Sequence, residues 1–287
     1  SSFDKHMNVD GIHEYLEELN KNTFSKYDIM TVGEANGVDA SESEMWVGEE
    51  NGKFNIDSFQ KKSAELLAKQ ESLVIILNTP AHNPTGYSLT LEDWDHVIAV
   101  LQEEAKCGKA IALVIDAAYI DFAGDEEEYR RFLPKLEVLP ENVLPIMAYS
   151  LSKTYTLYGT RCGAMICIAK TKEIADEFKR VCEYSSRGAW SNSAKVAQVI
   201  LSRIYGEPGL LERVDKERAH YREMLIKRGR AFEEEAKKVG LKIVPFDAGF
   251  FISIPCSDPD AISAKLEKEG VFIVPLAKGL RVSSFHF

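Results

Sequence analysis

Short apolar runs alternate with amphipathic stretches over most of this chain, and that alternation restricts the fold more than any other feature. The runs cover residues 73–77, 111–115, 143–149 and 164–168. Short runs that are apolar on both faces are typical of parallel strands buried under helices. A capping-box pattern at Thr90 predicts one of the intervening helices, running to about Cys107. The sequence therefore predicts an α/β fold with a doubly wound, mainly parallel sheet.

The C-terminal part has a different pattern. Helices are expected over residues 171–185 and 193–206, and then one long charged helix from about Pro208 to Lys238. Beyond it, strands over 241–244, 249–253 and 271–274 surround a helix over 261–268. We therefore predict a large domain over residues 57–207 and a small α+β domain over 208–287. Residues 1–56 do not continue the downstream pattern and form an atypical N-terminal segment.

Composition excludes several classes of partner. The chain has 287 residues, with Lys+Arg 35 against Asp+Glu 45, a net charge of −10. Nucleic acid and anionic membrane surfaces both require a basic protein surface, so neither is expected as a partner. No apolar run approaches the roughly 20 residues that span a bilayer. The 5 cysteines are odd in number and lack metal-ligand spacing, which favours a reducing, cytoplasmic location and no metal site.

Polar residues follow three of the predicted strands at the point where each strand ends. Asn83 lies in the run Asn-Pro-Thr-Gly after the first strand, and Asp116 and Tyr119 follow the second. The run Ser-Leu-Ser-Lys, ending at Lys153, follows the third. Open α/β sheets bind ligands at the carboxyl ends of their strands, so these side chains are expected to meet at one edge.

These residue types suit pyridoxal 5′-phosphate (PLP), a cofactor that acts as an electron sink. Lys153 would form a Schiff base with the cofactor and then act as a general base. Asp116 would pair with the pyridine nitrogen and keep it protonated. Tyr119 and Asn83 would donate hydrogen bonds to the phenolic oxygen.

Other residues would hold the two anionic groups of cofactor and substrate. Ser150, Ser152 and Arg161 are candidates for the phosphate, with Arg161 offering a two-pronged guanidinium. Arg281, and with it Asn83, would bind the substrate carboxylate. Taken singly, each signal also has an ordinary structural explanation: a turn, a helix cap or a surface ion pair. The prediction rests on their occurrence together and in this order.

The same motifs, in the same order, resemble those of the class I/II aminotransferases among the fold-type-I PLP enzymes, over about residues 57–284. The resemblance implies a three-layer PLP-dependent transferase-like large domain, here with an incomplete sheet, and a small C-terminal domain. It also implies a homodimer that moves an amino group between an amino acid of aspartate or aromatic type and a 2-oxo acid. Trp190-Ser191-Asn192 resembles a segment that lines the substrate pocket.

A second resemblance covers about residues 4–55, from Gly11-Ile12-His13-Glu14 through the strand-like run that ends at Glu34. It is similar to the α-glucosidase branch of the α-amylase superfamily, in which Glu34 would match the proton donor. Glycoside hydrolysis needs two carboxylates, and the matching nucleophile is absent. The segment is therefore expected to be a fragment of that family without its activity.

Alternative functions remain open at this level. A PLP-dependent lyase would use the same cofactor site, since product outcome depends on pocket details. Arg281 favours the transferase because it suits a 2-oxo acid. A catalytically inert truncated or chimeric product is a further alternative. The family's N-terminal segment is not recognisable, and the chain ends at Phe287, where the family continues.

Overall fold

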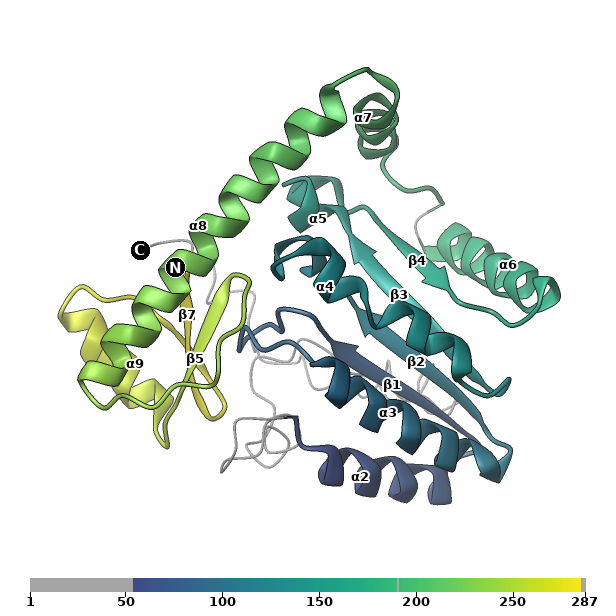
Figure 1. The fold of residues 1–287 in the computed structure, drawn as a ribbon, viewed down its shortest axis with the longest axis horizontal. Helices are drawn as coiled ribbons and strands as arrows, with labels where there is room; N and C mark the ends of the chain where they lie inside the picture. The colour runs from purple at the N-terminus through teal and green to yellow at the C-terminus, as the bar shows by residue number, and fades with distance from the viewer. Residues whose placement is uncertain (1–53, 190, 285–287) are drawn as a thin grey trace.

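The computed structural model describes residues 54–189 and 191–284, and a 4-stranded sheet lies at the centre of this part (Figure 1). Its strands, in spatial order, are β1 (Ser72–Asn78), β2 (Ala110–Asp116), β3 (Val143–Ser150) and β4 (Gly163–Cys167). β1, β2 and β3 run parallel, and β4 runs antiparallel to β3. The predicted α/β fold with a mainly parallel sheet is confirmed.

One face of this sheet carries the core. α2 (Ile56–Lys69) and α3 (Leu91–Glu104) lie side by side along β1 in Figure 1, and η5 (Leu133–Val138) follows them. Alternate residues of β1 are fully buried, while those between them are only partly buried. The Trp94 ring of α3 stacks on Phe132, with centroids 4.5 Å apart. The first two strands are therefore buried more deeply on one face, rather than equally on both as expected.

The start of α3 confirms the predicted capping box. Thr90 Oγ1 accepts a hydrogen bond from the backbone N–H of Asp93 at 3.0 Å, and the Asp93 carboxylate accepts one from Thr90 N at 2.9 Å. Each bond satisfies a backbone donor that the first helical turn leaves without a partner. After α3, η3 (Ala105–Cys107) ends at Gly108, whose φ of 76° suits glycine.

The fourth strand differs from its prediction. Residues 164–168 were expected to form another buried parallel strand, but β4 is antiparallel and exposed, with Met165 57% and Ile166 49% accessible. Between β3 and β4 lie only α5 (Leu151–Thr154) and η6 (Tyr158–Thr160). These short elements reverse the chain, whereas a parallel partner needs a crossover that carries the chain back along the sheet.

Three longer helices follow β4. They are α6 (Lys172–Ala189), α7 (Lys195–Gly206) and α8 (Leu210–Lys238). The 29-residue α8 confirms the predicted long helix, and Figure 1 shows it running from α7 to the C-terminal elements. Two further short elements, η4 (Ile120–Phe122) and α4 (Glu126–Arg130), lie between β2 and η5 in the chain, and η4 contacts α8. None of the helices in the described residues combines the length and apolar character needed to cross a membrane.

A second, antiparallel sheet forms beyond α8. It contains β5 (Phe251–Pro255), β6 (Val274–Leu276) and β7 (Gly279–Ser283) in the order β5-β7-β6, with α9 (Pro259–Lys268) between β5 and β6. The predicted strand over 241–244 is wrong. Leu241 N donates to the α8 carbonyl of Ala236, and Val244 N makes a single bond to Ser253 O instead of a ladder. The other two predicted strands lie two to three residues later than expected.

The loop after β1 joins the two sheets. Gly86 O accepts hydrogen bonds from Asp247 N at 2.9 Å and Ala248 N at 3.1 Å, and Ser253 Oγ donates to Pro84 O at 2.8 Å. Gly86 has a φ of 76°, and a Cβ there would lie 2.4 Å from Phe251 O. Only glycine fits this contact without strain. The boundary between domains near residue 208 stays a prediction.

Candidate active site

Two polar residues end neighbouring parallel strands. Asn78 is the last residue of β1 and Asp116 the last of β2, and the two are directly paired in register. Asn78 Nδ2 donates a hydrogen bond to Asp116 Oδ2 at 2.8 Å, while Asp116 Oδ1 accepts from Ala118 N at 3.2 Å. The sequence did not single out Asn78. Asn78 lies at the carboxyl end of a parallel strand, and the same kind of position identified Asp116. That signal could therefore have identified Asn78 as well.

Asn83 connects this strand edge with two other predicted site residues. Its backbone N–H donates to Asn78 Oδ1 at 2.8 Å, and its Nδ2 lies 3.4 Å from the hydroxyl oxygen of Tyr119. Its amide oxygen accepts a hydrogen bond from Arg281 NH1 at 3.1 Å. One continuous network therefore includes Asp116, Asn83, Tyr119 and Arg281.

Lys153 lies on α5, directly beyond the end of β3. Its Nζ is 5.4 Å from the ring centroid of Tyr119 and 4.3 Å from that of Tyr158. Both distances are in the range of cation–π contacts. The amine thus lies beside a residue of the Asn83 network, as predicted. Tyr158 was missed, because nothing in the sequence marks an aromatic residue five positions beyond Lys153 as its neighbour.

The predicted phosphate ligands make two separate contacts. Ser150 Oγ accepts a hydrogen bond from Ser152 N at 3.3 Å and so caps the short helix that carries Lys153. Arg161 has a φ of 49°, and its NH1 donates to Tyr158 O at 3.1 Å. Ser150 pairs with Gly163 across β3 and β4, which places these residues at the same end of the sheet. Their joint role at a phosphate stays a prediction.

Arg281 reaches the site from the second sheet. On β7 it pairs with Ser253 of β5 and Val274 of β6. Its guanidinium carbon lies 4.6 Å from the ring centroid of Phe251, and its NH1 donates to Asn83 Oδ1 at 3.1 Å. The second sheet thus adds a cation to an edge that already carries the carboxylate of Asp116.

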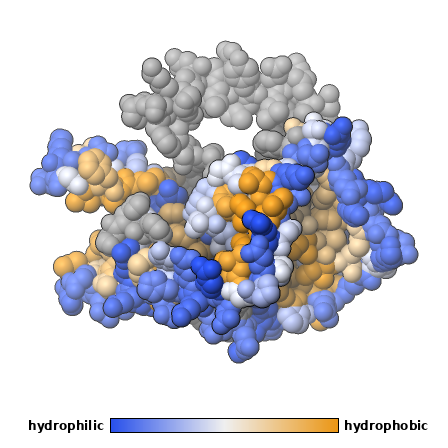
Figure 2. Space-filling model, turned by 90° about the horizontal axis from the view of Figure 1, so that it is seen from above, coloured by the Kyte–Doolittle hydropathy of each residue, from blue (hydrophilic) through white to orange (hydrophobic). Residues whose placement is uncertain are grey.

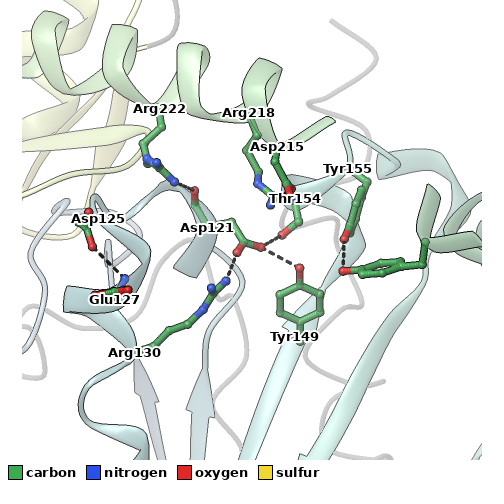
Figure 3. A network of polar contacts seen from close by, with 11 residues as sticks. Asp121, Asp125, Glu127, Arg130, Tyr149, Thr154, Tyr155, Asp215, Arg218 and Arg222 are labelled. Carbon is green, nitrogen blue, oxygen red and sulfur yellow. Dashed lines mark hydrogen bonds and ion pairs between the residues drawn. The ribbon is translucent and has the colours of Figure 1, made fainter. Parts of the chain in front are cut away.

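A buried carboxylate contacts the helix that carries Lys153 through Thr154 (Figure 3). Asp121 of η4 is 1% exposed and accepts hydrogen bonds from Tyr149 OH at 2.7 Å and Thr154 Oγ1 at 2.6 Å. Its other oxygen forms an ion pair with Arg130 at 2.6 Å. The sequence analysis did not identify Asp121, because these partners come together only in the fold.

Burial changes the titration of a histidine next to Asn83. His82 Nδ1 lies 2.8 Å from Thr85 Oγ1, and burial lowers the pKa of His82 to about 4. The ring is therefore neutral at physiological pH, and Thr85 Oγ1 also accepts a hydrogen bond from Tyr87 N at 3.2 Å. These contacts stabilise the turn that presents Asn83.

Two residues that the resemblances singled out lie outside the described part of the chain. They are Glu34, matched to a glycosidase proton donor, and Trp190, matched to a substrate-pocket segment. Among the residues that are described, no cluster of three or more His, Cys, Asp or Glu side chains is arranged to hold a metal ion.

The sequence profile of the family "Aminotransferase class I and II" matches residues 36–284. The chain belongs to this family. The match begins ahead of residue 57, where the resemblance was expected to start. An aminotransferase from Anaerococcus prevotii has a similar solved structure, with a TM-score of 0.80 and 37% sequence identity. The similarity covers 84% of this chain and 58% of that one, so this aminotransferase-family chain spans just over half of its relative.

A more distant structure shares the fold. The aromatic-amino-acid aminotransferase from Burkholderia pseudomallei, solved covalently bound to pyridoxal phosphate, has a TM-score of 0.65 and 21% identity. The similarity covers 81% of this chain and 56% of that one. The expected α/β transferase-like fold is thereby confirmed.

The second resemblance is also confirmed as a short match. Over 55 residues, or 19% of this chain, the sequence is 62% identical to "Probable oligo-1,6-glucosidase 3" of Bacillus subtilis. The match covers 10% of that protein. It reaches too little of the glucosidase to carry a glycosidase active site, which needs two carboxylates.

Proposed function

We propose that this chain binds PLP covalently through Lys153 and moves an amino group between an amino acid and a 2-oxo acid. The observation that carries the proposal is the side-chain network from Asp116 through Asn83 to Tyr119 and Arg281, with the Lys153 amine 5.4 Å from the Tyr119 ring. Membership of the aminotransferase family and the PLP-bound fold neighbour both support it.

The donor set fits PLP on three sides. Asp116 offers a carboxylate to a protonated pyridine nitrogen, and Asn78 orients that carboxylate through a 2.8 Å hydrogen bond. Tyr119 and Asn83 offer donors for the phenolic oxygen, and Lys153 offers an amine for the aldehyde carbon. The proposed phosphate ligands are Ser150 at the end of β3, Ser152 of α5, and Arg161 between η6 and β4.

Each residue then has a distinct task during transfer. When bound, PLP supplies an electron sink for negative charge that develops on the substrate carbon. Asp116 holds a proton on the ring nitrogen, and Arg281 orients the substrate through its carboxylate. With the cofactor bound, Lys153 would act as the general base that takes a proton from the substrate carbon.

A spectrum of the purified chain tests this function. PLP should produce an absorbance band that borohydride fixes onto Lys153, and addition of an amino acid should convert the band to that of the amine form. Lys153→Ala should abolish the band. Lys172→Ala, at an exposed lysine of α6 that pairs with Asp176, should retain it. Absence of a band at saturating PLP would contradict the proposal and favour the inert alternative.

Association into a homodimer forms part of the same proposal. Large apolar side chains are exposed on β4 and α7, including Met165, Ile166, Val196 and Val199. Figure 2 views the molecule from the side on which α7 lies in Figure 1 and shows hydrophobic residues next to hydrophilic ones on this surface. Exposed apolar patches commonly mark protein interfaces. Light scattering should give twice the mass of the 287-residue chain, and a monomer at micromolar concentration would contradict the dimer.

A further inference from the structure

The buried carboxylate of Asp121 is an unusual group to find behind a short helix. It is fully buried, and both of its oxygens have hydrogen-bond partners. Arg130 donates to Oδ1, and the hydroxyl groups of Tyr149 and Thr154 donate to Oδ2. Apolar residues of similar volume commonly stabilise a core as well as a buried ion pair does. Bulk stability therefore gives little reason for a charged residue at this position.

The two hydroxyl donors lie on either side of Lys153 in the chain. Tyr149 is near the end of β3, and Thr154 is the last residue of α5. One oxygen of Asp121 thus binds both the strand that precedes Lys153 and the last residue of the short helix that contains Lys153. Burial, and then the charge of Asp121, raises the pKa of Tyr149 above its ordinary value, so the phenol stays protonated and donates.

The segment that carries Asp121 also touches the Lys153 side chain. Tyr119, two residues earlier, has its ring 5.4 Å from Lys153 Nζ and its hydroxyl within 3.4 Å of Asn83 Nδ2. The segment from Tyr119 to Asp121 therefore contacts the Lys153 region at both of its ends. The Tyr119 ring lies beside the Lys153 amine, and the Asp121 carboxylate accepts a hydrogen bond from Thr154, the next residue of the helix (Figure 3 shows the second contact).

We propose that Asp121 is a positioning residue for Lys153, acting through Thr154 and Tyr149 to hold the amine over Tyr119 and in reach of a cofactor aldehyde. This inference rests on the proposed function for its meaning in catalysis. The positioning itself is a property of the chain's own residues and can be measured without PLP.

Matched substitutions at Thr154 separate the hydrogen bond from packing. Thr154→Val keeps the shape of the side chain and removes the hydroxyl, whereas Thr154→Ser keeps the hydroxyl and removes a methyl group. Tyr149→Phe removes the other donor to the same oxygen and serves as a second variant if Thr154→Val does not fold. All three leave the ion pair between Asp121 and Arg130 in place.

Two readouts are compared for each variant. The first is acetylation of Lys153 by acetic anhydride between pH 7 and 10 without PLP, measured by peptide mass spectrometry against Lys172, which is 81% exposed. The second is the rate at which PLP becomes borohydride-fixable on Lys153.

A hydrogen bond to a charged group is strong enough for Thr154→Val and Tyr149→Phe to slow PLP attachment about tenfold. Both should also move the Lys153 acetylation profile toward that of Lys172, and Thr154→Ser should restore most of both values.

The outcomes distinguish this inference from the proposed function. If PLP never attaches but Thr154→Val still changes Lys153 acetylation, the proposed function fails and the positioning role stands. If PLP attaches and both hydroxyl-removing variants match the wild type in both readouts, the positioning role is overturned and the proposed function stands. Equal losses in Thr154→Val and Thr154→Ser would also overturn it, because packing would then be the cause.

Discussion

Arg281 NH1 lies 3.1 Å from the amide oxygen of Asn83, a residue 198 positions earlier in the chain. The contact joins β7 of the second sheet to the loop after β1 of the first. The site is therefore complete only when both sheets have folded and docked. In this arrangement Arg281 bonds a neutral amide, and a substrate carboxylate would be a stronger acceptor for the same guanidinium.

Arg281→Lys should weaken substrate use while leaving covalent PLP attachment intact. A lysine is a point charge and cannot offer the two parallel N–H groups that fit a carboxylate. Loss of a charge-assisted hydrogen bond should raise the amino acid concentration for half-conversion of the absorbance band about tenfold or more. Arg213→Ala, at an exposed arginine of α8, is the control. Equal half-conversion in Arg281→Lys and wild type would argue against a carboxylate at Arg281.

Asn78→Asp should make the stability of the protein depend on pH. The new carboxylate would face Asp116, where the Asn78 amide now donates at 2.8 Å. Two adjacent carboxylates raise one pKa in the folded state, so the pair binds a proton more tightly there than when unfolded. The stabilisation that this pair of carboxylates contributes is then highest at low pH, and it is lost as the pH rises through the raised pKa. Urea unfolding at pH 5 and pH 8 measures this loss. Asn78→Ala should lack this loss, and an Asn78→Asp variant that follows Asn78→Ala at both pH values would show that the two groups do not interact.

His82 should lower the free energy of unfolding of the protein in acid. Its pKa is lowered from 6.5 to about 4 in the folded protein, so the unfolded chain binds a proton first as the pH falls. The stabilisation is fully present above pH 6.5 and decreases between pH 6.5 and 4, by up to about 3 kcal/mol. The free energy of unfolding of His82→Gln should therefore change less over this window. His220→Gln, at an exposed position on α8, should follow the wild type. The same acid loss in His82→Gln would refute the assignment.

Two glycines in helices should respond in opposite ways to alanine. A Cβ at Gly229 of α8 would lie 2.1 Å from the Phe246 ring, whereas one at Gly188 of α6 would meet nothing within 4 Å. Gly229→Ala should cost about 1–3 kcal/mol from overpacking, despite the better helix propensity of alanine. Gly188→Ala should be neutral or stabilise by up to about 1 kcal/mol. Thermal unfolding of both variants tests this, and a more stable Gly229→Ala would show that Phe246 moves aside easily.

Much of the site could be predicted because parallel strands deliver their ends to one edge. Once the strands over 73–77, 111–115 and 143–149 were recognised, the polar residues after them had to lie close together. That reasoning placed Asn83, Asp116, Tyr119 and Lys153 near one another without any long-range information. Arg281 was a candidate because a guanidinium suits a carboxylate, and only the fold shows that it contacts Asn83.

Other features depended on tertiary contacts that no local pattern encodes. Asp121 acquires its partners from β3, α5 and α4, and a residue in a turn gives no local sign of such neighbours. Tyr158 meets Lys153 only because η6 folds back over the amine. The direction of β4 was predicted wrongly, since an apolar run has the same sequence pattern in either orientation. The roles of Ser150, Ser152 and Arg161 at a phosphate remain a prediction.

The length of α8 has a mechanical consequence. At about 1.5 Å per residue its 29 residues form a rod of roughly 44 Å. Arg222, near its middle, contacts the carbonyl oxygen of Asp121 at 3.5 Å, and Gly229, seven residues further on, packs against the Phe246 ring ahead of β5. The same helix therefore contacts both the segment that carries Asp121 and the residue that leads into β5, so it constrains both sides of the contact between Asn83 and Arg281.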